Sequence, residues 1–186
     1  MVWAIPVFFS HVDFKHKGFY MKASRVFGLI CLAMVVNCAA IFAQTVSSDG
    51  NYLLFKDSFG MTTLWKYNGN AAVVAIPSVI DGETITKIGA DAFKNCSFLT
   101  SVTIPATVTS IENSAFMGCT ALTSVTLPGS VRKIGNYAFA GCSSLAALTL
   151  PGFVENKIDK RAFEGCISLS SETVASLVRL GYRGRI

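Results

Sequence analysis

Histidine is nearly absent from this chain of 186 residues, because its two histidines, His11 and His16, both lie close to the N-terminus. Without histidine in the rest of the chain, the Ser–His and Cys–His pairs that activate nucleophiles are excluded there. Acidic residues are also few, and Asp81, Glu112 and Asp159 fall in separate predicted loops, with no pair placed for acid–base chemistry. No glycine-rich phosphate loop follows a predicted strand. The sequence therefore predicts no catalytic site and no cofactor.

A strong net charge is lacking as well. The formal charge is +5, but beyond Ala43 the chain holds 12 Lys and Arg against 10 Asp and Glu. Nucleic-acid binding would need a concentrated basic face, so we do not expect it. The C-terminal half does carry a basic cluster, which we interpret either as scattered solvated charges or as a contact for an acidic glycan or protein. Its members are Arg132, Lys133, Lys157, Lys160, Arg161, Arg179, Arg183 and Arg185.

The segment 21–43 has the pattern of a secretory signal peptide. Met21 and a short basic stretch precede an apolar run from Val26 to Val36, and small residues lead up to Ala43. Cleavage after Ala43 would free Gln44. A retained membrane anchor is the alternative, although Asn37 interrupts the run and a span needs roughly 20 apolar residues. We interpret residues 1–20 as an extension from an over-long start, so that translation begins at Met1 or at Met21.

Cys38 adds a second hypothesis for the same segment. Val35-Val36-Asn37-Cys38 loosely matches a bacterial lipoprotein cleavage site, at which the cysteine becomes the lipidated N-terminus. The plainer interpretation is a cysteine within an apolar run. Membrane attachment through a lipidated Cys38 and release as a free protein therefore both stay open.

An internal repeat dominates the rest of the sequence. The pattern Ala-Phe-x-x-Cys occurs four times, with spacings of 23, 23 and 24 residues between the phenylalanines. An Ile lies four residues before each Ala, a Leu lies three residues after each Cys, and apolar-Pro pairs recur at the same period. The repeated positions are Phe93 and Cys96, Phe116 and Cys119, Phe139 and Cys142, and Phe163 and Cys166.

Within each unit the pattern predicts a short strand followed by tight turns. Leu122, Val125 and Leu127 alternate with Thr and Ser, which is typical of a strand with one buried face, and Pro128 ends it because proline cannot donate a ladder hydrogen bond. The chain then turns inward and makes a tight helical turn that buries Ala and Phe. One unit cannot bury these residues alone, so the units must stack into a continuous core.

The repeat resembles the BspA-like class of leucine-rich repeats, which includes the treponemal leucine-rich-repeat proteins. The resemblance covers residues 71–186 and implies an α/β solenoid: a short right-handed leucine-rich-repeat coil of 23-residue units with a parallel concave sheet. The segment from Ile76 to Gly89 resembles the family's first repeat with its insertion around Asp81-Gly82, and the tail from Gly181 resembles its C-terminal ending. An extra residue near Glu155 departs from the period.

Both ends of such a coil need caps. Two strand-like runs within residues 51–67, split by Ser58-Phe59-Gly60, predict a hairpin cap over residues 44–70. Repeats then fill residues 71–169, and residues 170–186 form a C-terminal cap helix and tail. We expect Ser170 or Ser171 to cap the helix, with Val174, Leu177 and Val178 facing the last repeat.

The four repeat cysteines predict a structural column. They should stack at the strand spacing of about 4.8 Å. A column does not converge on one point as the ligands of a zinc site must, and its parallel side chains do not favour disulfide geometry. We therefore expect buried thiols and no metal.

The residues expected to point outward from the concave sheet are small and uncharged. Small side chains let the backbone of a partner approach closely, and solenoids commonly bind on this face. The alternative is that Ser and Thr are simply favoured in strands and keep the face soluble. The candidates are Thr100, Ser101, Thr103, Thr123, Ser124, Thr126, Ala146, Ala147 and Thr149, with Ala72, Val73 and Ala75 added by the first strand.

The resemblance implies a non-catalytic, protein-binding protein of a bacterial surface that adheres to host extracellular-matrix proteins or to cells. We expect it to be exported, whether secreted, periplasmic or on the outer surface. A structural scaffold of the bacterial envelope that docks onto bacterial partners is the main alternative. Glycan binding would need aromatic platforms, for which Tyr137 and Phe153 are the candidates.

Overall fold

The computed structural model describes residues 43–155 and 158–186. The expected extension over residues 1–20, the expected signal peptide up to residue 42, and Cys38 lie outside these ranges, as do Asn156 and Lys157. The described strands are β1 (Ala43–Val46), β2 (Tyr52–Lys56), β3 (Thr62–Tyr67), β4 (Val73–Ala75), β5 (Val79–Ile80), β6 (Glu83–Ile88), β7 (Ser101–Thr103), β8 (Ser110–Ile111), β9 (Ser124–Thr126), β10 (Lys133–Ile134) and β11 (Ala147–Thr149), and the helix is α2 (Ser171–Arg179).

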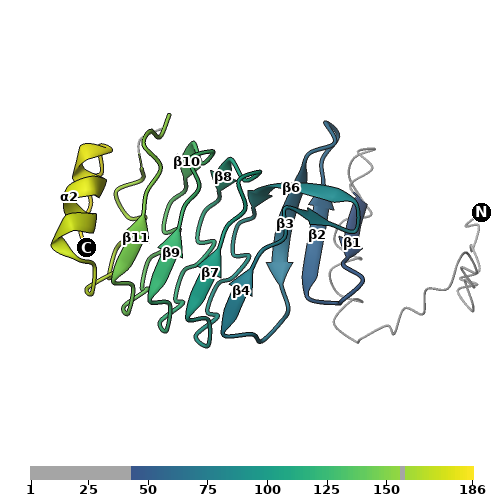
Figure 1. Ribbon diagram of the computed structural model, residues 1–186, viewed down its shortest axis with the longest axis horizontal. Helices are drawn as coiled ribbons and strands as arrows, with labels where there is room; N and C mark the ends of the chain where they lie inside the picture. The colour runs from purple at the N-terminus through teal and green to yellow at the C-terminus, as the bar shows by residue number, and fades with distance from the viewer. Residues whose placement is uncertain (1–42, 156–157) are drawn as a thin grey trace, which may run out of the picture. The chain divides into compact units, whose positions relative to one another are not determined.

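A four-stranded parallel sheet forms one side of the coil, in the order β11-β9-β7-β4 (Figure 1). Each strand pairs with its equivalent one repeat later, so that Val74, Val102, Val125 and Leu148 lie side by side and point into the core. These strands are the ones that the repeat predicts. Each is only three residues long because an apolar-Pro pair follows it.

A seven-stranded sheet forms the other side, in the order β1-β2-β3-β6-β8-β10, with β5 paired to β6. Strands β1, β2 and β3 are antiparallel, whereas β3, β6, β8 and β10 are parallel. The parallel part stacks Ile88, Ile111 and Ile134, the isoleucines that precede the first three Ala-Phe pairs, and all three are buried.

A third hydrogen-bond ladder runs along the Ala-Phe turns. The backbone N–H groups of Asp91, Phe93 and Asn95 donate to carbonyls of the next coil over 2.7–3.1 Å. Those of Lys94 and Cys96 donate within their own coil instead. The tight turn that the sequence suggests is therefore present and buries Ala92 and Phe93, but half of its N–H groups bond between coils.

The alternation has a conformational cost at two positions in a coil. Asp91 and Asn95 adopt positive φ angles of 57° and 61°, a region that residues with a side chain rarely occupy. Gly118 and Gly141 occupy the position of Asn95 in the next two repeats, where glycine has no side chain to oppose the left-handed conformation. The repeated Gly before each later Cys is therefore explained by the backbone.

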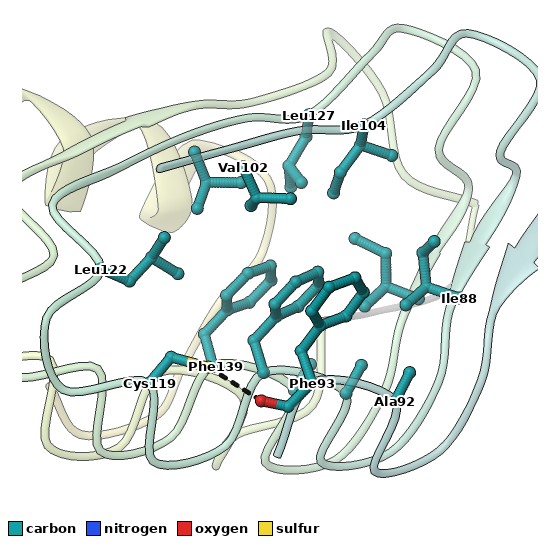
Figure 2. Close-up of a cluster of buried hydrophobic side chains, with 14 of the residues drawn as sticks. Ile88, Ala92, Phe93, Val102, Ile104, Cys119, Leu122, Leu127 and Phe139 are labelled. Carbon is teal, nitrogen blue, oxygen red and sulfur yellow. Dashed lines mark hydrogen bonds between the residues drawn. The ribbon is translucent and has the colours of Figure 1, made fainter. Parts of the chain in front are cut away.

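The core is organised around a column of aromatic rings. Phe93, Phe116, Phe139 and Phe163 stack with ring centroids 4.9, 5.2 and 5.3 Å apart and with planes within 13° of parallel. All four are fully buried. Figure 2 shows the stacked rings surrounded by three groups of side chains. These are the isoleucines of the seven-stranded sheet, the residues of the Ala-Phe turns and the inward residues of the four-stranded sheet. This column runs the length of the repeats.

A tyrosine ends the aromatic column on each side. Tyr67 of β3 stacks on Phe93 at 5.0 Å, and its hydroxyl oxygen accepts a hydrogen bond from the N–H of Ala71. Tyr182 meets Phe163 edge-on at 5.6 Å, and its hydroxyl donates to the carbonyl of Arg185. Tyrosine suits these places because its ring extends the core while its hydroxyl reaches polar partners.

The N-terminal end is covered by β1, β2 and β3. Strands β2 and β3 form an antiparallel hairpin where the sequence predicts one, and β1 adds a further antiparallel strand that the sequence analysis does not predict. The insertion at the first repeat is tied to this part of the chain, since the N–H and hydroxyl of Ser48 both donate to the Asp81 carboxylate over 2.7 Å. Cleavage after Ala43 would leave Gln44 as the first residue of β1.

The C-terminal end is covered by α2, which begins after the N-cap Ser170. The expectation that Val178 faces the last repeat is wrong, because its side chain is 49% exposed. Thr173 and Leu177 are the buried positions, and Leu180 continues their row at the i, i+4, i+7 spacing of one helical face. Val174 is half-buried beside this row.

The aromatic column generates a stability prediction. Phe116→Ala should lower the free energy of unfolding by about 3–5 kcal/mol, because it removes a fully buried ring and leaves a cavity. Phe59→Ala is the matched control, since Phe59 is 89% exposed at the hairpin tip and should change stability by no more than about 0.5 kcal/mol. Urea unfolding followed by circular dichroism measures both. Equal losses in the two variants would contradict the described core.

Candidate interaction surface

The outward side chains of the four-stranded sheet form two columns across the repeats. We define the four-stranded face as these two columns together with Thr100, Thr123 and Ala146, which lie just before the strands. The first column is Val73, Ser101, Ser124 and Ala147, and the second is Ala75, Thr103, Thr126 and Thr149. The nine predicted outward residues of the repeats therefore lie side by side on one surface.

The four-stranded face has hydroxyl groups of two kinds. Thr100 and Thr123 donate to the carbonyls of Ala72 and Thr100, one coil earlier, over 2.9 and 3.0 Å. These two hydroxyls therefore help to join the coils. The hydroxyls of Thr103, Thr126 and Thr149 are exposed, and no hydrogen bond uses them within residues 43–155 and 158–186. The hydroxyls of Ser101 and Ser124 in the first column likewise make no hydrogen bond among the described residues, but these serines are half-buried, so the second column offers the more exposed polar groups.

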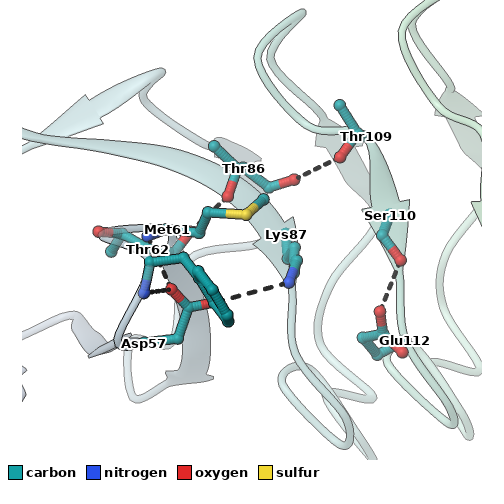
Figure 3. Close-up of polar contacts among 9 residues, drawn as sticks. Asp57, Met61, Thr62, Thr86, Lys87, Thr109, Ser110 and Glu112 are labelled. Atoms are coloured by element: carbon teal, nitrogen blue, oxygen red, sulfur yellow. Dashed lines mark hydrogen bonds and ion pairs between the residues drawn. The ribbon is translucent and has the colours of Figure 1, made fainter. Parts of the chain in front are cut away.

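The outer surface of the seven-stranded sheet differs because most of its charged side chains pair with each other, as Figure 3 shows for Lys87 and Asp57. Lys56 lies 2.8 Å from Glu83, Lys87 lies 3.9 Å from Asp57, and Lys133 lies 2.7 Å from Glu112. Threonine hydroxyls also cross this surface from strand to strand, as from Thr86 to Thr62 and from Thr109 to Thr86. A partner on this side would have to displace contacts that the protein already makes.

Glu112 shows how closely these charges are held. Burial opposes its ionised form, but hydrogen bonds from the Lys133 ammonium at 2.7 Å and the Ser110 hydroxyl at 2.6 Å outweigh that effect. The pKa of the Glu112 carboxyl is consequently held below its usual value. Because a lowered folded-state pKa stabilises the protein above the unfolded-state pKa, this contribution is lost as the pH falls through the folded-state value.

The repeat cysteines have a structural role. Cys96, Cys119, Cys142 and Cys166 are buried free thiols. Each of the last three lies 3.1 Å from the carbonyl oxygen of the repeat phenylalanine one coil earlier, to which its S–H donates. Sequence reasoning predicts the burial but not this donor role, which the repeated Phe-x-x-Cys spacing creates. Among the described residues no cluster of His, Cys, Asp and Glu could hold a metal ion.

The surroundings of Cys96, Cys142 and Cys166 make these thiols poor nucleophiles. Burial raises the pKa of Cys96 to about 11 and that of Cys166 to about 12. The contact with Cys119, together with burial, raises the pKa of Cys142. The hydrogen bond with Cys142 lowers the pKa of Cys119, but the Cys119 side chain is fully buried. Because only an accessible thiolate reacts readily, we expect the column to be unreactive in the folded protein.

The C-terminal basic residues do not form one patch. Lys133 is paired with Glu112, Arg132 lies 3.6 Å from Glu155, and the Arg161 guanidinium lies over the Tyr137 ring at 5.4 Å and hydrogen-bonds to its hydroxyl. Lys160, Arg179, Arg183 and Arg185 lie on the last repeat, α2 and the tail, and Lys157 lies outside the described residues.

A groove borders the four-stranded face at its C-terminal end. It has a volume of about 590 Å³ and lies between β11 and α2. Sequence reasoning misses it, because the groove depends on how far the cap helix lies from the last strand. Its lining consists of Ala147, Leu148, Thr149, Leu150, Pro151, Gly152, Ser170, Glu172, Thr173, Ser176, Arg179 and Leu180.

Within the described part of the chain, no helix combines the length and the apolar composition that a membrane crossing requires.

Comparison with known proteins gives one family match and several similar structures. The sequence profile described as "BspA type Leucine rich repeat region" matches residues 72–182 in six copies. A leucine-rich-repeat protein from Bacteroides capillosus is 29% identical with a TM-score of 0.56, over 67% of this chain and 93% of that one. No match to a curated protein was found.

A leucine-rich cell surface protein from Faecalibacterium prausnitzii is 37% identical with a TM-score of 0.50, over 56% of this chain. The match spans only 30% of that larger protein. The leucine-rich-repeat protein of T. pallidum is also similar, with 20% identity and a TM-score of 0.32 over 80% of this chain.

The thiol column generates a reactivity prediction. In the folded protein Cys96, Cys119, Cys142 and Cys166 should resist iodoacetamide at pH 8, because they are buried and their S–H groups donate to carbonyls or sit among apolar side chains. All four should be alkylated in guanidinium chloride, which mass spectrometry of the peptides measures. Alkylation of any of them in the folded protein at its unfolded rate would show that the column is open.

Proposed function

The chain belongs to the BspA-type leucine-rich-repeat family, and from this premise we propose that it is an exported protein-binding module, a bacterial surface adhesin that contacts host extracellular-matrix proteins or cells through its four-stranded face. The fold and the family are those of leucine-rich-repeat proteins, which are generally non-catalytic, and the binding role rests on the outward surface of the coil.

The observation that carries the proposal is the contrast between the two sheets. Four of the five charged strand residues of the seven-stranded sheet are in ion pairs, Lys66 being the exception, whereas the four-stranded face carries no charged side chain in its two columns. Three exposed threonine hydroxyls, the half-buried hydroxyls of Ser101 and Ser124, and the 67% exposed Val73 remain available on it. A neutral surface with small side chains can accept a partner backbone without first losing an internal contact or desolvating a charge.

The size of the face limits its affinity. Four strands at a spacing of about 4.8 Å and three residues at about 3.3 Å each give a floor of about 200 Å². A standard protein interface buries about 800 Å² on each partner. We therefore expect weak binding by the floor alone, strengthened by its borders or by several copies displayed on one cell surface.

Export is part of the proposal and rests on the sequence. The pattern of residues 21–43 is that of a signal peptide, and Cys38 offers a route to lipid attachment. The buried thiols suit an oxidising environment outside the cytoplasm, because burial seals them from oxidants.

Two alternatives make different use of the same fold. A scaffold of the bacterial envelope would use the four-stranded face for a bacterial partner and would bind no host protein. Glycan binding is less favoured, because the Arg161 guanidinium already covers one face of the Tyr137 ring. Only Phe153, 62% exposed, remains of the two predicted aromatic platforms.

The function is tested by binding of the full chain, purified from expressing cells, to an immobilised panel of host extracellular-matrix proteins. Thr103→Glu with Thr126→Glu should weaken any saturable binding by at least about tenfold, because two carboxylates would then be buried under the partner without a counter-charge. Surface plasmon resonance measures the affinities.

A matched control carries the same two charges outside the face, as Ser97→Glu with Thr120→Glu in exposed turns, and should bind as the unmodified protein does. Binding that survives in the Thr103 and Thr126 variant would remove the four-stranded face from the proposal. Absence of binding to every matrix protein at micromolar concentration would favour the envelope scaffold.

A further inference from the structure

The outer side of the N-terminal cap is apolar, whereas the rest of the seven-stranded sheet is charged on that side. Residues opposite each other in an antiparallel pair point to the same side of the sheet, and every second residue of a strand shares that side. The register of β1, β2 and β3 therefore assigns six side chains to the outward side, and none of them is charged. We call this surface the outer cap face, and it consists of Gln44, Val46, Leu53, Phe55, Thr63 and Trp65.

The hairpin of β2 and β3 is apolar on both of its sides. Its inward residues Leu54 and Leu64 are buried in the core. On the outward side the rings of Phe55 and Trp65 pack against each other with centroids 5.8 Å apart, and Trp65 is 40% exposed. An antiparallel sheet with one face in water commonly carries polar residues on that face. An apolar outward side is instead typical of a surface that contacts a partner or a membrane.

The tip of the hairpin presents a further aromatic ring. Phe59 is 89% exposed, so most of its ring lies in water. The turn that carries it is held in place, because the Asp57 carboxylate accepts the N–H groups of Phe59 and Met61 over 3.0 and 2.9 Å. The N–H of Gly60 also donates to the Asp57 carbonyl over 3.0 Å. The chain thus holds an apolar ring at a defined place in water, which is unfavourable unless an apolar surface covers it.

The chain enters the cap at the same end as this tip. In the β1–β2 register Ala43 lies opposite Lys56, the residue before Asp57. Cys38, the candidate for lipid attachment, precedes Ala43 by five residues. Five extended residues reach about 17 Å at about 3.4 Å per residue. A lipid chain on Cys38 would therefore hold the end of the cap that carries Phe59 close to a bilayer surface.

We propose that the outer cap face and the Phe59 tip rest on the lipid bilayer to which the chain is attached. Tryptophan and phenylalanine side chains favour the boundary between the headgroups and the acyl chains, where their rings leave water. Gln44 and Thr63 add uncharged polar groups that suit the headgroup region. Because the face is neutral, the contact depends on apolar burial and does not require anionic lipid.

This inference rests on the proposed function, because it uses the attachment through Cys38 that the proposed function includes. It adds a second surface with a different partner. The outer cap face belongs to the seven-stranded sheet, and the four-stranded face lies on the other side of the coil. A cap that rests on the bilayer through its outer side therefore leaves the four-stranded face free to meet a protein.

Trp65 is itself the probe for this contact. The chain has two tryptophans, so that Trp3→Phe leaves Trp65 as the only one. The full chain with this substitution is purified from expressing cells in detergent and reconstituted into phosphatidylcholine vesicles, either plain or with bromine on the acyl chains of the lipid. Bromine quenches tryptophan emission on contact. We expect the brominated vesicles to lower the emission of Trp65 at least about twofold, because its ring lies at the edge of the acyl chains.

Matched variants separate this contact from the presence of the anchor. Trp65→Phe with Val178→Trp moves the reporter to an exposed position of α2, beyond the last repeat, where the emission should not be quenched. In the Trp65 reporter, Phe59→Glu should at least about halve the quenching, because a carboxylate at the tip opposes entry into the apolar layer. Phe153→Glu replaces an exposed ring after β11 and should leave the quenching unchanged.

Three results would overturn the proposal. The first is Trp65 emission that brominated lipid leaves unchanged, and the second is equal quenching in the two reporters. The third is a mature chain that begins at Gln44, which mass spectrometry identifies and which would lack the attachment. If Trp65 is not quenched by lipid and is nevertheless shielded from iodide in water, the outer cap face contacts a protein surface instead of the bilayer.

The matrix-protein assay separates this inference from the proposed function. Saturable matrix binding with unquenched Trp65 would keep the adhesin function and remove the membrane contact. Quenched Trp65 without matrix binding would keep the membrane contact and remove the host-adhesin function. Thr103→Glu with Thr126→Glu should weaken matrix binding and leave the quenching of Trp65 unchanged, because the two surfaces lie on different sides of the coil.

Discussion

The stacking of one phenylalanine per coil is the constraint on which the rest of the structure depends. Ring centroids 4.9–5.3 Å apart lie close to the spacing of about 4.8 Å between hydrogen-bonded strands, so the aromatic column and the strand ladders share one repeat distance. The third ladder, along the Ala-Phe turns, holds each ring at that distance, and each later cysteine bonds to the carbonyl of the ring residue one coil earlier. A 23-residue unit brings all these contacts into register together.

Because the interior is filled by the same packing contacts in every coil, a binding function has to use the outward-facing residues. Ion pairs such as Lys133 with Glu112 occupy the seven-stranded side, and the tyrosines at both ends close the core. Gly184 shows how tightly the end is closed, because a Cβ there would lie 1.7 Å from the carbonyl oxygen of Lys160. The neutral four-stranded face and the groove beside α2 are the surfaces on which a partner could add contacts without breaking existing ones.

The sequence predicts the structural features that recur in every repeat. Phe116, Cys119, Val125 and their equivalents are buried where the period places them, because each position meets the same neighbours in every coil. Two features that occur once, strand β1 and the groove, escape the pattern. The repeated bond from a cysteine thiol to a phenylalanine carbonyl escapes it as well, because it depends on how neighbouring coils are placed in space. The cap helix is predicted in part. Its amphipathic spacing predicts that a helix forms, but the face that it buries carries Thr173 and Leu177 and not Val178. None of these patterns identifies the binding partner, because the partner contacts only outward residues that the repeat does not constrain.

A double-mutant cycle on the phenylalanine column tests the account most directly. Phe116→Leu and Phe139→Leu remove neighbouring rings, and their combined effect on the free energy of unfolding should differ from the sum of the single effects by about 0.5–1.5 kcal/mol. Phe93→Leu with Phe139→Leu, two rings separated by Phe116, should be additive. Coupling confined to the neighbouring pair is the predicted result. Equal coupling in both cycles, or none in either, would contradict an interior held in register by ring-to-ring stacking.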